Sequence, residues 1–319
     1  MRNVKNILFS VLAILLLTFS FTSCEKEFIP KGIDDAEEIV VEGYIEAVVD
    51  GGQPTPPYVI LTKSVPFFQE IQGGIDDLFV RGAEVTVSDG ENTYTLTELC
   101  WEDLAPAQQQ QAAGIFGFDL DSFDLNFCVY IDLSLSLVPQ EGKTYYLTVK
   151  AGDKTVTSQT TIPPHVPLDS LSFREPTGLP NDTMSEGRAF MSDPAGQADY
   201  YRFFTAVNGG NFTKSFQSVT DDRWFDGKAN FQFVLQNPEN VGQDANPDTW
   251  GLFNVGDTVS IKWCNLDKAH YDFWNTLEYN AQSGGPFSSY TRIQSNIVGG
   301  LGIWGGYSVS YYDVVVPVR

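Results

Sequence analysis

The sequence has few of the residues that most often bind metals or nucleic acids. Among its 319 residues there are only two histidines, His165 and His270, and the four cysteines form no CxxC pair, so a zinc-type metal centre is not expected. Lysine and arginine number 19 against 41 aspartates and glutamates, which gives a formal net charge of −22. A chain this acidic is not expected to bind nucleic acid.

Common catalytic motifs are also missing. The chain contains neither a GxSxG nucleophile elbow nor an HExxH zinc motif. Cys264 and His270 are expected on a strand and a helix, and we interpret them as a buried thiol and a helix-surface histidine rather than a catalytic pair. We therefore predict a protein that is not an enzyme and has no cofactor. A glycan or peptide hydrolase is the alternative, because two carboxylates suffice for glycoside hydrolysis and the acidic residues are many.

The only long hydrophobic run lies at the N-terminus. There Arg2 and Lys5 precede about fifteen mostly apolar residues, from Ile7 to Phe21. This run is too short to span a bilayer core of about 30 Å comfortably, and it is typical of a signal peptide. It ends in Phe21-Thr22-Ser23-Cys24, which matches a bacterial lipobox except for the phenylalanine at its first position.

The lipobox predicts a lipid anchor. We expect cleavage to remove residues 1–23 and acylation, for example by palmitate, to modify Cys24. Residues 24–37 are polar and are then a lipidated tether. The acyl chains, rather than a basic surface, hold such an acidic protein on a membrane. An ordinary signal peptide followed by an incidental cysteine is the alternative.

Alternating apolar and polar residues predict an all-β fold with two β-sandwich-like domains. In residues 38–164, short runs rich in Val, Ile, Thr and Tyr are joined by turns such as Asp89-Gly90, which is typical of an immunoglobulin-like or transthyretin-like sandwich. Three prolines in Ile162–Pro167 predict a linker. Residues 165–319 form the second, β-rich domain, with one helix expected over Leu266–Asn280. The predicted strands are Glu38–Val49, Tyr58–Ser64, Ala83–Ser88, Thr93–Leu99, Cys128–Leu133, Thr144–Lys150, Lys154–Ile162, Leu168–Phe173, Ala198–Val207, Ala229–Gln236, Thr258–Cys264 and Tyr307–Val316.

Cys100 and Cys128 are the natural disulfide pair of an exported chain. They flank one excursion, whereas Cys264 lies in a separate strand pattern. Two buried thiols are the alternative. The excursion from Trp101 to Phe127 includes a predicted surface helix, and insertions of this type often carry function. Trp101 is therefore a candidate contact residue.

Asp244, Asn246 and Asp248 alternate along a polar loop, as oxygen ligands of Ca²⁺ often do. Thr249 stands where an EF-hand loop has glycine, and Val255 stands where it has a bidentate glutamate. An EF-hand is therefore excluded, and a looser calcium site is the remaining metal hypothesis. A polar turn without metal is the alternative.

Several short motifs follow one another in a distinctive order. They are Val41-Glu-Gly-Tyr44-Ile45, Arg81-Gly-Ala-Glu-Val-Thr-Val87, Gly142-Lys-Thr-Tyr-Tyr-Leu147, Ile162-Pro163, Leu168-Asp-Ser-Leu171, Asp193-Pro194, Asp199-Tyr-Tyr-Arg202, Phe225-Asp-Gly227, Gly256-Asp-Thr-Val259, Asp267 to Phe273, Pro286-Phe287, Ser295-Asn296-Ile297 and Gly299-Gly300-Leu301-Gly302. This order resembles a Bacteroidota lipoprotein family known as domain of unknown function 4249. The resemblance covers essentially the whole chain after the predicted cleavage site.

The resemblance implies a function in transport or at the cell surface. Members of that family are commonly encoded beside TonB-dependent outer-membrane receptors, so it implies an accessory or ligand-binding lipoprotein of such a receptor. It supplies no catalytic residues. A surface adhesive or structural lipoprotein is the alternative.

The same reasoning predicts a lipid-anchored protein of the outer membrane. Glu25-Lys26-Glu27 resembles the export signal of surface lipoproteins, which favours surface display over the periplasmic face. A TonB-dependent receptor is the expected partner. The segment Gly299, Gly300, Leu301 and Gly302 is a second candidate contact, with a structural turn before the last strand as its alternative.

Overall fold

The computed structural model describes residues 37–65, 74–116, 126–177, 182–241, 245–282 and 292–318. Residues 37–319 form one compact unit, in which strands dominate, so the predicted all-β fold is confirmed. The described helices are α2 (Pro106–Phe116) and α3 (Lys268–Gln282), with 3₁₀ turns η2 (Ile75–Leu78), η3 (Trp101–Asp103) and η4 (Pro238–Asn240). The described strands are β1 (Ile39–Asp50), β2 (Tyr58–Lys63), β3 (Glu84–Ser88), β4 (Thr93–Cys100), β5 (Cys128–Ile131), β6 (Thr144–Ala151), β7 (Lys154–Thr161), β8 (Leu168–Arg174), β9 (Met184–Met191), β10 (Tyr200–Val207), β11 (Thr213–Asp221), β12 (Phe231–Val234), β13 (Phe253–Asn254), β14 (Thr258–Leu266) and β15 (Leu301–Val315).

Eleven of these strands form one sheet, in the order β11-β10-β14-β15-β1-β2-β5-β4-β3-β6-β7. The first and last strands of the chain meet inside it: β1 runs parallel to β15, from the pair Val40 and Leu301 to the pair Asp50 and Ser310. A second sheet consists of β8, β12 and β13, all paired with β9. The two halves of the chain therefore share a sheet and are not connected only by Ile162–Pro167.

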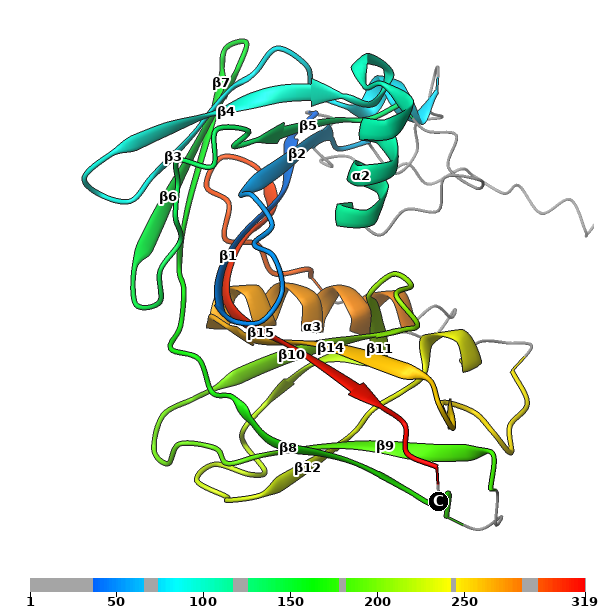
Figure 1. The fold of residues 1–319 in the computed structure, drawn as a ribbon. Helices are drawn as coiled ribbons and strands as arrows, with labels where there is room; N and C mark the ends of the chain where they lie inside the picture. Colours follow the sequence, from blue (N-terminus) through cyan, green and yellow to red (C-terminus); the bar gives the residue numbers. More distant parts are fainter. Residues whose placement is uncertain are drawn as a thin grey trace, which may run out of the picture. The chain divides into compact units, whose positions relative to one another are not determined.

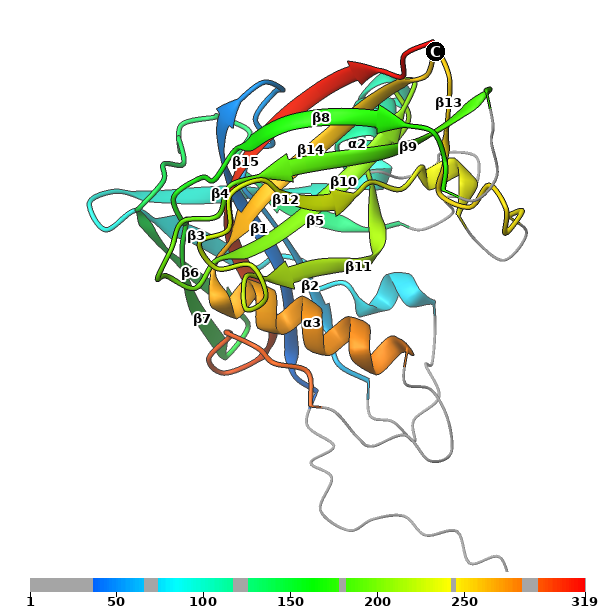
Figure 2. The ribbon, with the colours of Figure 1, turned by 90° about the horizontal axis from the view of Figure 1, so that it is seen from below.

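Two hydrophobic cores lie on one face of the large sheet. The first is formed mainly by residues 39–162, and the second lies between β10, β14, β15 and the second sheet (Figure 2). Because alternate residues of a strand share a face, β15 contributes Trp304 to the first core and Tyr312 to the second. Along the chain, Ile162 belongs to the first core and Val166 to the second, so the boundary between the two cores lies within the predicted linker.

The opposite face of the large sheet carries both described helices (Figure 1), and we call it the inner face. α3 packs on β10, β11 and β15, over Cys264 and Val309. Asp267 begins this helix: its Oδ1 accepts a hydrogen bond from the His270 N–H at 2.8 Å, and its Oδ2 accepts one from the Thr160 hydroxyl. Asp267 is therefore the N-cap of α3 and also ties this helix to β7.

The structure corrects one interpretation of a side chain. His270 was expected on the helix surface, but it is 1% exposed, and the buried face of α3 also includes Tyr271 and Glu278. The interpretation of Cys264 as a buried thiol is confirmed. The difference arises because the helix buries a partly polar face, so the apolar residues alone did not indicate which side faces the sheet.

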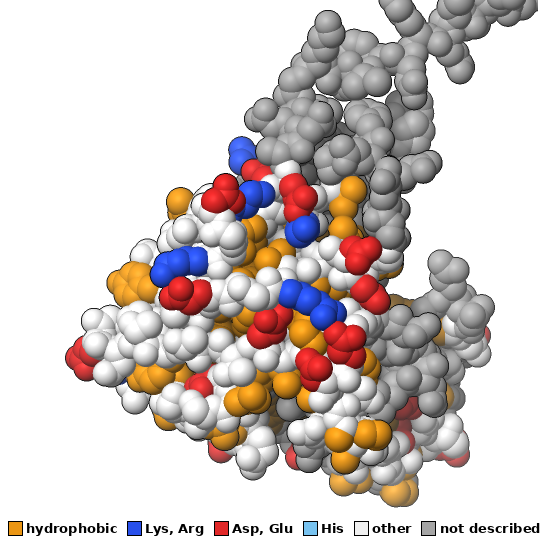
Figure 3. Space-filling view, turned by 90° about the horizontal axis from the view of Figure 1, so that it is seen from above, with side chains coloured by type: hydrophobic (Ala, Val, Ile, Leu, Met, Phe, Trp, Pro, Cys, Tyr) orange, Lys and Arg blue, Asp and Glu red, His pale blue; other side chains and the backbone are white. Residues whose placement is uncertain are grey.

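The surface combines charged and apolar side chains. On the face seen in Figure 3, basic and acidic groups lie next to one another between hydrophobic ones. Exposed ion pairs of the described chain include Arg81 with Glu102 and Lys150 with Glu84. No helix in the described ranges is long and apolar enough to cross a membrane.

Candidate functional site

The structure describes only part of the predicted calcium site. Asp244 lies outside the described residues, as does the predicted lipidation site Cys24. Asn246 accepts a hydrogen bond from the backbone N–H of Asp248 at 3.0 Å, and both are exposed. Asp248 belongs to no group of described acidic, histidine or cysteine side chains whose ligand atoms lie close together. The calcium site therefore stays a prediction.

Gly299, Gly300 and Gly302 lie in tight structural surroundings. A Cβ on Gly302, which has a φ of +107°, would lie 1.9 Å from the carbonyl oxygen of Val41, and one on Gly300 would lie 2.5 Å from that of Ile39. These glycines thus allow β15 to approach β1 closely. Leu301 is 39% exposed, and its contact with a partner stays a prediction.

Trp101 forms one wall of an apolar pocket of about 210 Å³. Its ring stacks on that of Phe127, with centroids 5.5 Å apart, and the Gln109 side chain donates a hydrogen bond to its carbonyl oxygen at 3.0 Å. β4 and β5 form the floor of this pocket and the start of α2 forms a side. We call it the Trp101 pocket; its lining residues are Pro56, Leu99, Trp101, Leu104, Gln108, Ala112, Phe127, Val129, Ile131 and Leu133.

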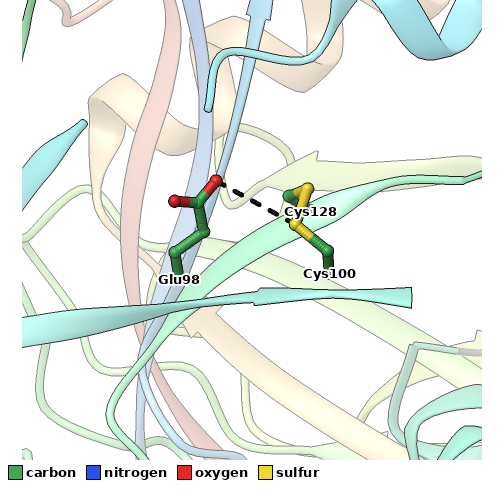
Figure 4. A group of neighbouring side chains, drawn as sticks. All are labelled: Glu98, Cys100 and Cys128. Atoms are coloured by element: carbon green, nitrogen blue, oxygen red, sulfur yellow. Dashed lines mark hydrogen bonds between the residues drawn. A yellow bond between two sulfur atoms is a disulfide. The ribbon is translucent and has the colours of Figure 1, made fainter. Parts of the chain in front are cut away.

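A disulfide fixes the position of this pocket. Cys100 and Cys128 lie directly opposite each other on β4 and β5 and are bonded, so the predicted disulfide is confirmed. It holds the two ends of the excursion, next to Trp101 and Phe127. Glu98 lies near the Cys100 sulfur, at 4.0 Å (Figure 4). Because the two sulfurs are bonded to each other, they are not thiolates, and this group does not suit a metal.

An apolar loop borders the pocket. Leu133 lines the pocket and is 55% exposed, and Leu135 is 62% exposed with a φ of 52°, a region that leucine rarely adopts. Asp132 is 2% exposed and accepts hydrogen bonds from the backbone N–H groups of Ser134 and Leu137. The buried carboxylate therefore holds the loop in a conformation that keeps two leucines in solvent.

Three carboxylates that the sequence did not single out converge in the second half of the chain. Asp193, Asp199 and Asp222 have oxygen atoms within 4.8 Å of one another. Asp193 accepts hydrogen bonds from the Tyr201 hydroxyl and the Gly227 N–H, and Asp222 accepts one from the Asp199 N–H. Burial and the neighbouring carboxylates raise the pKa of Asp199 and of Asp222. Each of the three follows or precedes a strand in a turn, so sequence position alone gave no signal of their convergence.

A polar pocket of about 350 Å³ adjoins this group through Asp222. The rings of Tyr200 and Tyr271 lie 4.8 Å apart in its wall. The Tyr271 hydroxyl donates to Asp221 at 3.1 Å, and Asp221 also pairs with Arg223 at 2.7 Å. The pocket combines aromatic rings with charges of both signs, which suits a polar ligand.

A buried ion pair lies on the inner face between β1 and β14. The Lys262 Nζ is 2.8 Å from the Glu46 Oε2, which also accepts a hydrogen bond from the Tyr307 hydroxyl at 2.8 Å. The Thr55 N–H donates to the other Glu46 oxygen at 2.7 Å. Burial raises the pKa of Glu46, but the Lys262 charge and the hydrogen bonds from Lys262 and Thr55 outweigh this effect and hold the pKa below its usual value.

The described residues lie almost entirely within a region that matches a known family. The model of the family described as Domain of unknown function (DUF4249) matches residues 25–313. The chain belongs to the DUF4249 family. None of the curated proteins compared with this DUF4249 chain matches it. A solved segment of two fibronectin type-III domains from chicken tenascin is 12% identical, with a TM-score of 0.18, and the match covers 72% of this chain and 91% of the tenascin segment. A likeness at that score carries no structural argument.

Proposed function

We propose that this DUF4249 chain is a non-enzymatic, lipid-anchored accessory protein of the outer membrane in a Bacteroidota cell, and that it binds a TonB-dependent receptor. The lipobox ending at Cys24 supports the anchor, and the family supports the receptor context. The Trp101 pocket with its rim leucines, Leu133 and Leu135, is the observation that carries the proposal, because ordered apolar groups exposed beside a pocket are typical of a protein contact.

The contact works by burial of apolar surface. A partner side chain that fills the Trp101 pocket shields the pocket walls and the Leu133 side chain from water. Burial of apolar surface contributes about 25 cal/mol of binding free energy per Å². The loop held by Asp132 needs little further ordering on binding, so less conformational entropy is lost. Two proteins on one membrane also meet at a raised effective concentration, so a modest contact is sufficient.

Affinity capture from detergent-solubilised outer membranes tests this function. The wild-type lipoprotein should capture a TonB-dependent barrel at near-stoichiometric yield. Leu133→Asp and Trp101→Ala should reduce that yield at least about tenfold, as loss of a hot-spot contact of roughly 2 kcal/mol does. Trp224→Ala is the matched control, because Trp224 is 79% exposed and does not line the pocket. Capture of no receptor, or equal capture by all variants, contradicts the proposal.

A hydrolase is the second candidate, and the convergence of Asp193, Asp199 and Asp222 beside a polar pocket favours it. Carboxyl groups with raised pKa can act as general acids near neutral pH. Purified wild-type protein should then cleave a glycan or peptide from a substrate panel, and Asp222→Asn should abolish the cleavage while Asp248→Asn leaves it unchanged. An inactive wild type on the whole panel removes this candidate.

A further inference from the structure

Arg202 is a buried cation without an acidic partner in the described chain. It lies on β10, is 6% exposed, and its Nε–H has no hydrogen-bond partner. Lys262, on the same face, contacts Glu46 at 2.8 Å, whereas the ion pairs between described residues do not include Arg202. A buried charge is costly unless an opposite charge or hydrogen bonds compensate it. The Arg202 charge acts on the Glu42 carboxyl, whose pKa it lowers against the effect of burial, but no ion pair of the described residues joins the two. The buried Nε–H of the guanidinium therefore has no acidic acceptor.

Aromatic rings fix the position of the guanidinium. Its central carbon lies 3.9 Å from the ring centroid of Trp274 on α3 and 4.8 Å from that of Phe204 on β10. Cation–π contacts of this kind are worth about 2 kcal/mol when they are desolvated. They hold the group in place but use none of its N–H donors. The donors are thus positioned on the inner face without an acceptor.

Two neighbouring side chains also have unpartnered polar atoms. The Trp274 Nε1 and both ring nitrogens of His270 are buried without a hydrogen-bond partner. His270 comes one helical turn before Trp274 and packs against Gly305 of β15 and the ring of Tyr44. Burial and the Arg202 charge lower the pKa of His270 to about 3, so the ring is neutral near pH 7, with one donor and one acceptor. Unpaired donors therefore outnumber unpaired acceptors in this cluster.

We propose that Arg202, with the indole N–H of Trp274 and the imidazole of His270, binds the carboxylate of a small organic acid on the inner face. A guanidinium presents a planar fork that matches the two oxygens of a carboxylate. One cation balances the single charge of a carboxylate, but not the charge of about −1.5 to −2 on a phosphate monoester near pH 7. The aromatic walls formed by Phe204 and Trp274 suit the organic part of such a ligand. This site is separate from the proposed receptor contact and does not depend on it.

Titration of the full-length protein with benzoate tests the site. By calorimetry, benzoate should bind wild type at least about tenfold more tightly than the neutral benzamide, as a charged hydrogen-bonded contact of roughly 1.5–3 kcal/mol requires. Arg202→Met should lose this preference, and Arg202→Lys should keep only part of it. Arg174→Met is the matched control, because Arg174 is an exposed arginine that pairs with Glu186 and lines neither described pocket, and it should bind benzoate as wild type does. Tighter binding of inorganic phosphate than of benzoate overturns the carboxylate assignment.

A second measurement keeps the test decisive if Arg202 variants unfold. In ¹⁵N-labelled wild type, the side-chain Nε–H resonance of Arg202 should move on addition of benzoate and not of benzamide. Trp274→Phe keeps the ring over the guanidinium but removes the indole N–H, so it should weaken benzoate binding several-fold without loss of fold. An Arg202 resonance that stays in place at millimolar benzoate overturns the proposal.

Discussion

At the residue scale, the Glu46–Lys262 pair shows how a buried charge depends on its partner. Lys262→Met should destabilise the protein by about 3–5 kcal/mol, because it leaves the Glu46 carboxylate, 2% exposed, without its cation. Urea unfolding measures this. The double variant Glu46→Leu with Lys262→Met should be more stable than Lys262→Met alone. Lys150→Met is the control: its ion pair with Glu84 is exposed and should be worth no more than about 1 kcal/mol.

His270 should make the stability depend on pH. Its pKa is about 3 in the folded protein, against the usual 6.5 in an unfolded chain, so between these two pH values the unfolded chain binds a proton that the folded protein does not. The contribution of neutral His270 to the free energy of unfolding is fully present above about pH 6.5. It falls by about 1.4 kcal/mol for each pH unit as the pH decreases towards 3. His270→Gln should remove this loss, so urea unfolding of both proteins from pH 7 to pH 4 should show a steeper decline in wild type. Parallel declines contradict the assignment of a neutral, buried His270.

At the element scale, the disulfide between β4 and β5 should stabilise the fold and the Trp101 pocket together. The two cysteines are 28 residues apart, and closing such a loop is worth about 3.5 kcal/mol by chain entropy. The double variant Cys100→Ala with Cys128→Ala should unfold at correspondingly lower urea and capture less receptor. A Cys264→Ser variant, which keeps the bridge, should behave as wild type in receptor capture. Unchanged stability of the double variant contradicts this role.

The contact between β1 and β15 depends on Gly302. Gly302→Ala adds a Cβ that would lie 1.9 Å from the Val41 carbonyl oxygen, at a φ of +107°. We expect a loss well above the roughly 1–2 kcal/mol that positive φ alone costs. Gly90→Ala separates the two effects, because Gly90 has a φ of +91° with nothing within 4 Å of the added Cβ. Chemical unfolding of both variants checks the difference, and equal losses contradict a clash at Gly302.

The sequence predicted the elements with clear local patterns. Thr93–Cys100 and Lys154–Thr161 alternate in residue type and in burial, and Asp267 has both the type and the position of an N-cap. β9 was not predicted, although it alternates in burial, because its buried positions include Ser185, Gly187 and Ala189. Small residues bury as well as large ones where the opposite layer is close, but they leave no hydrophobic signal.

The candidate sites were predictable only where they are local in sequence. Trp101 was found because it directly follows Cys100, one of a pair of cysteines that define an excursion. Asp193, Asp199 and Asp222 come from separate turns, and pairing of β10 with β11 brings two of them together. Arg202 did carry a signal, since it is a lone cation inside the apolar strand Tyr200–Val207. Its aromatic contacts with α3, however, depend on tertiary packing that no local pattern contains.

At the scale of the whole molecule, two cores share one sheet. The cores divide near Ile162–Pro167, as the proline-rich segment predicts, yet β15 crosses that division and enters both. The last strand, β15, therefore pairs with the first strand, β1, inside the large sheet. Pairing between residues so distant in sequence is costly in loop entropy, and it makes the two halves depend on each other for stability.

The isolated first half, residues 38–164, should therefore not fold cooperatively. It lacks Trp304, which is fully buried in the first core and donates its indole N–H to the Tyr145 carbonyl at 3.2 Å. Loss of so large a buried side chain costs about 3–5 kcal/mol, and β1 is also left with an unpaired edge. A fusion of residues 292–312 to this fragment through a flexible linker restores both contacts and should recover a cooperative urea transition and near-ultraviolet circular dichroism. A cooperative transition of the unfused fragment would instead show that its core is sufficient without β15, so that the two halves are independent domains despite their common sheet.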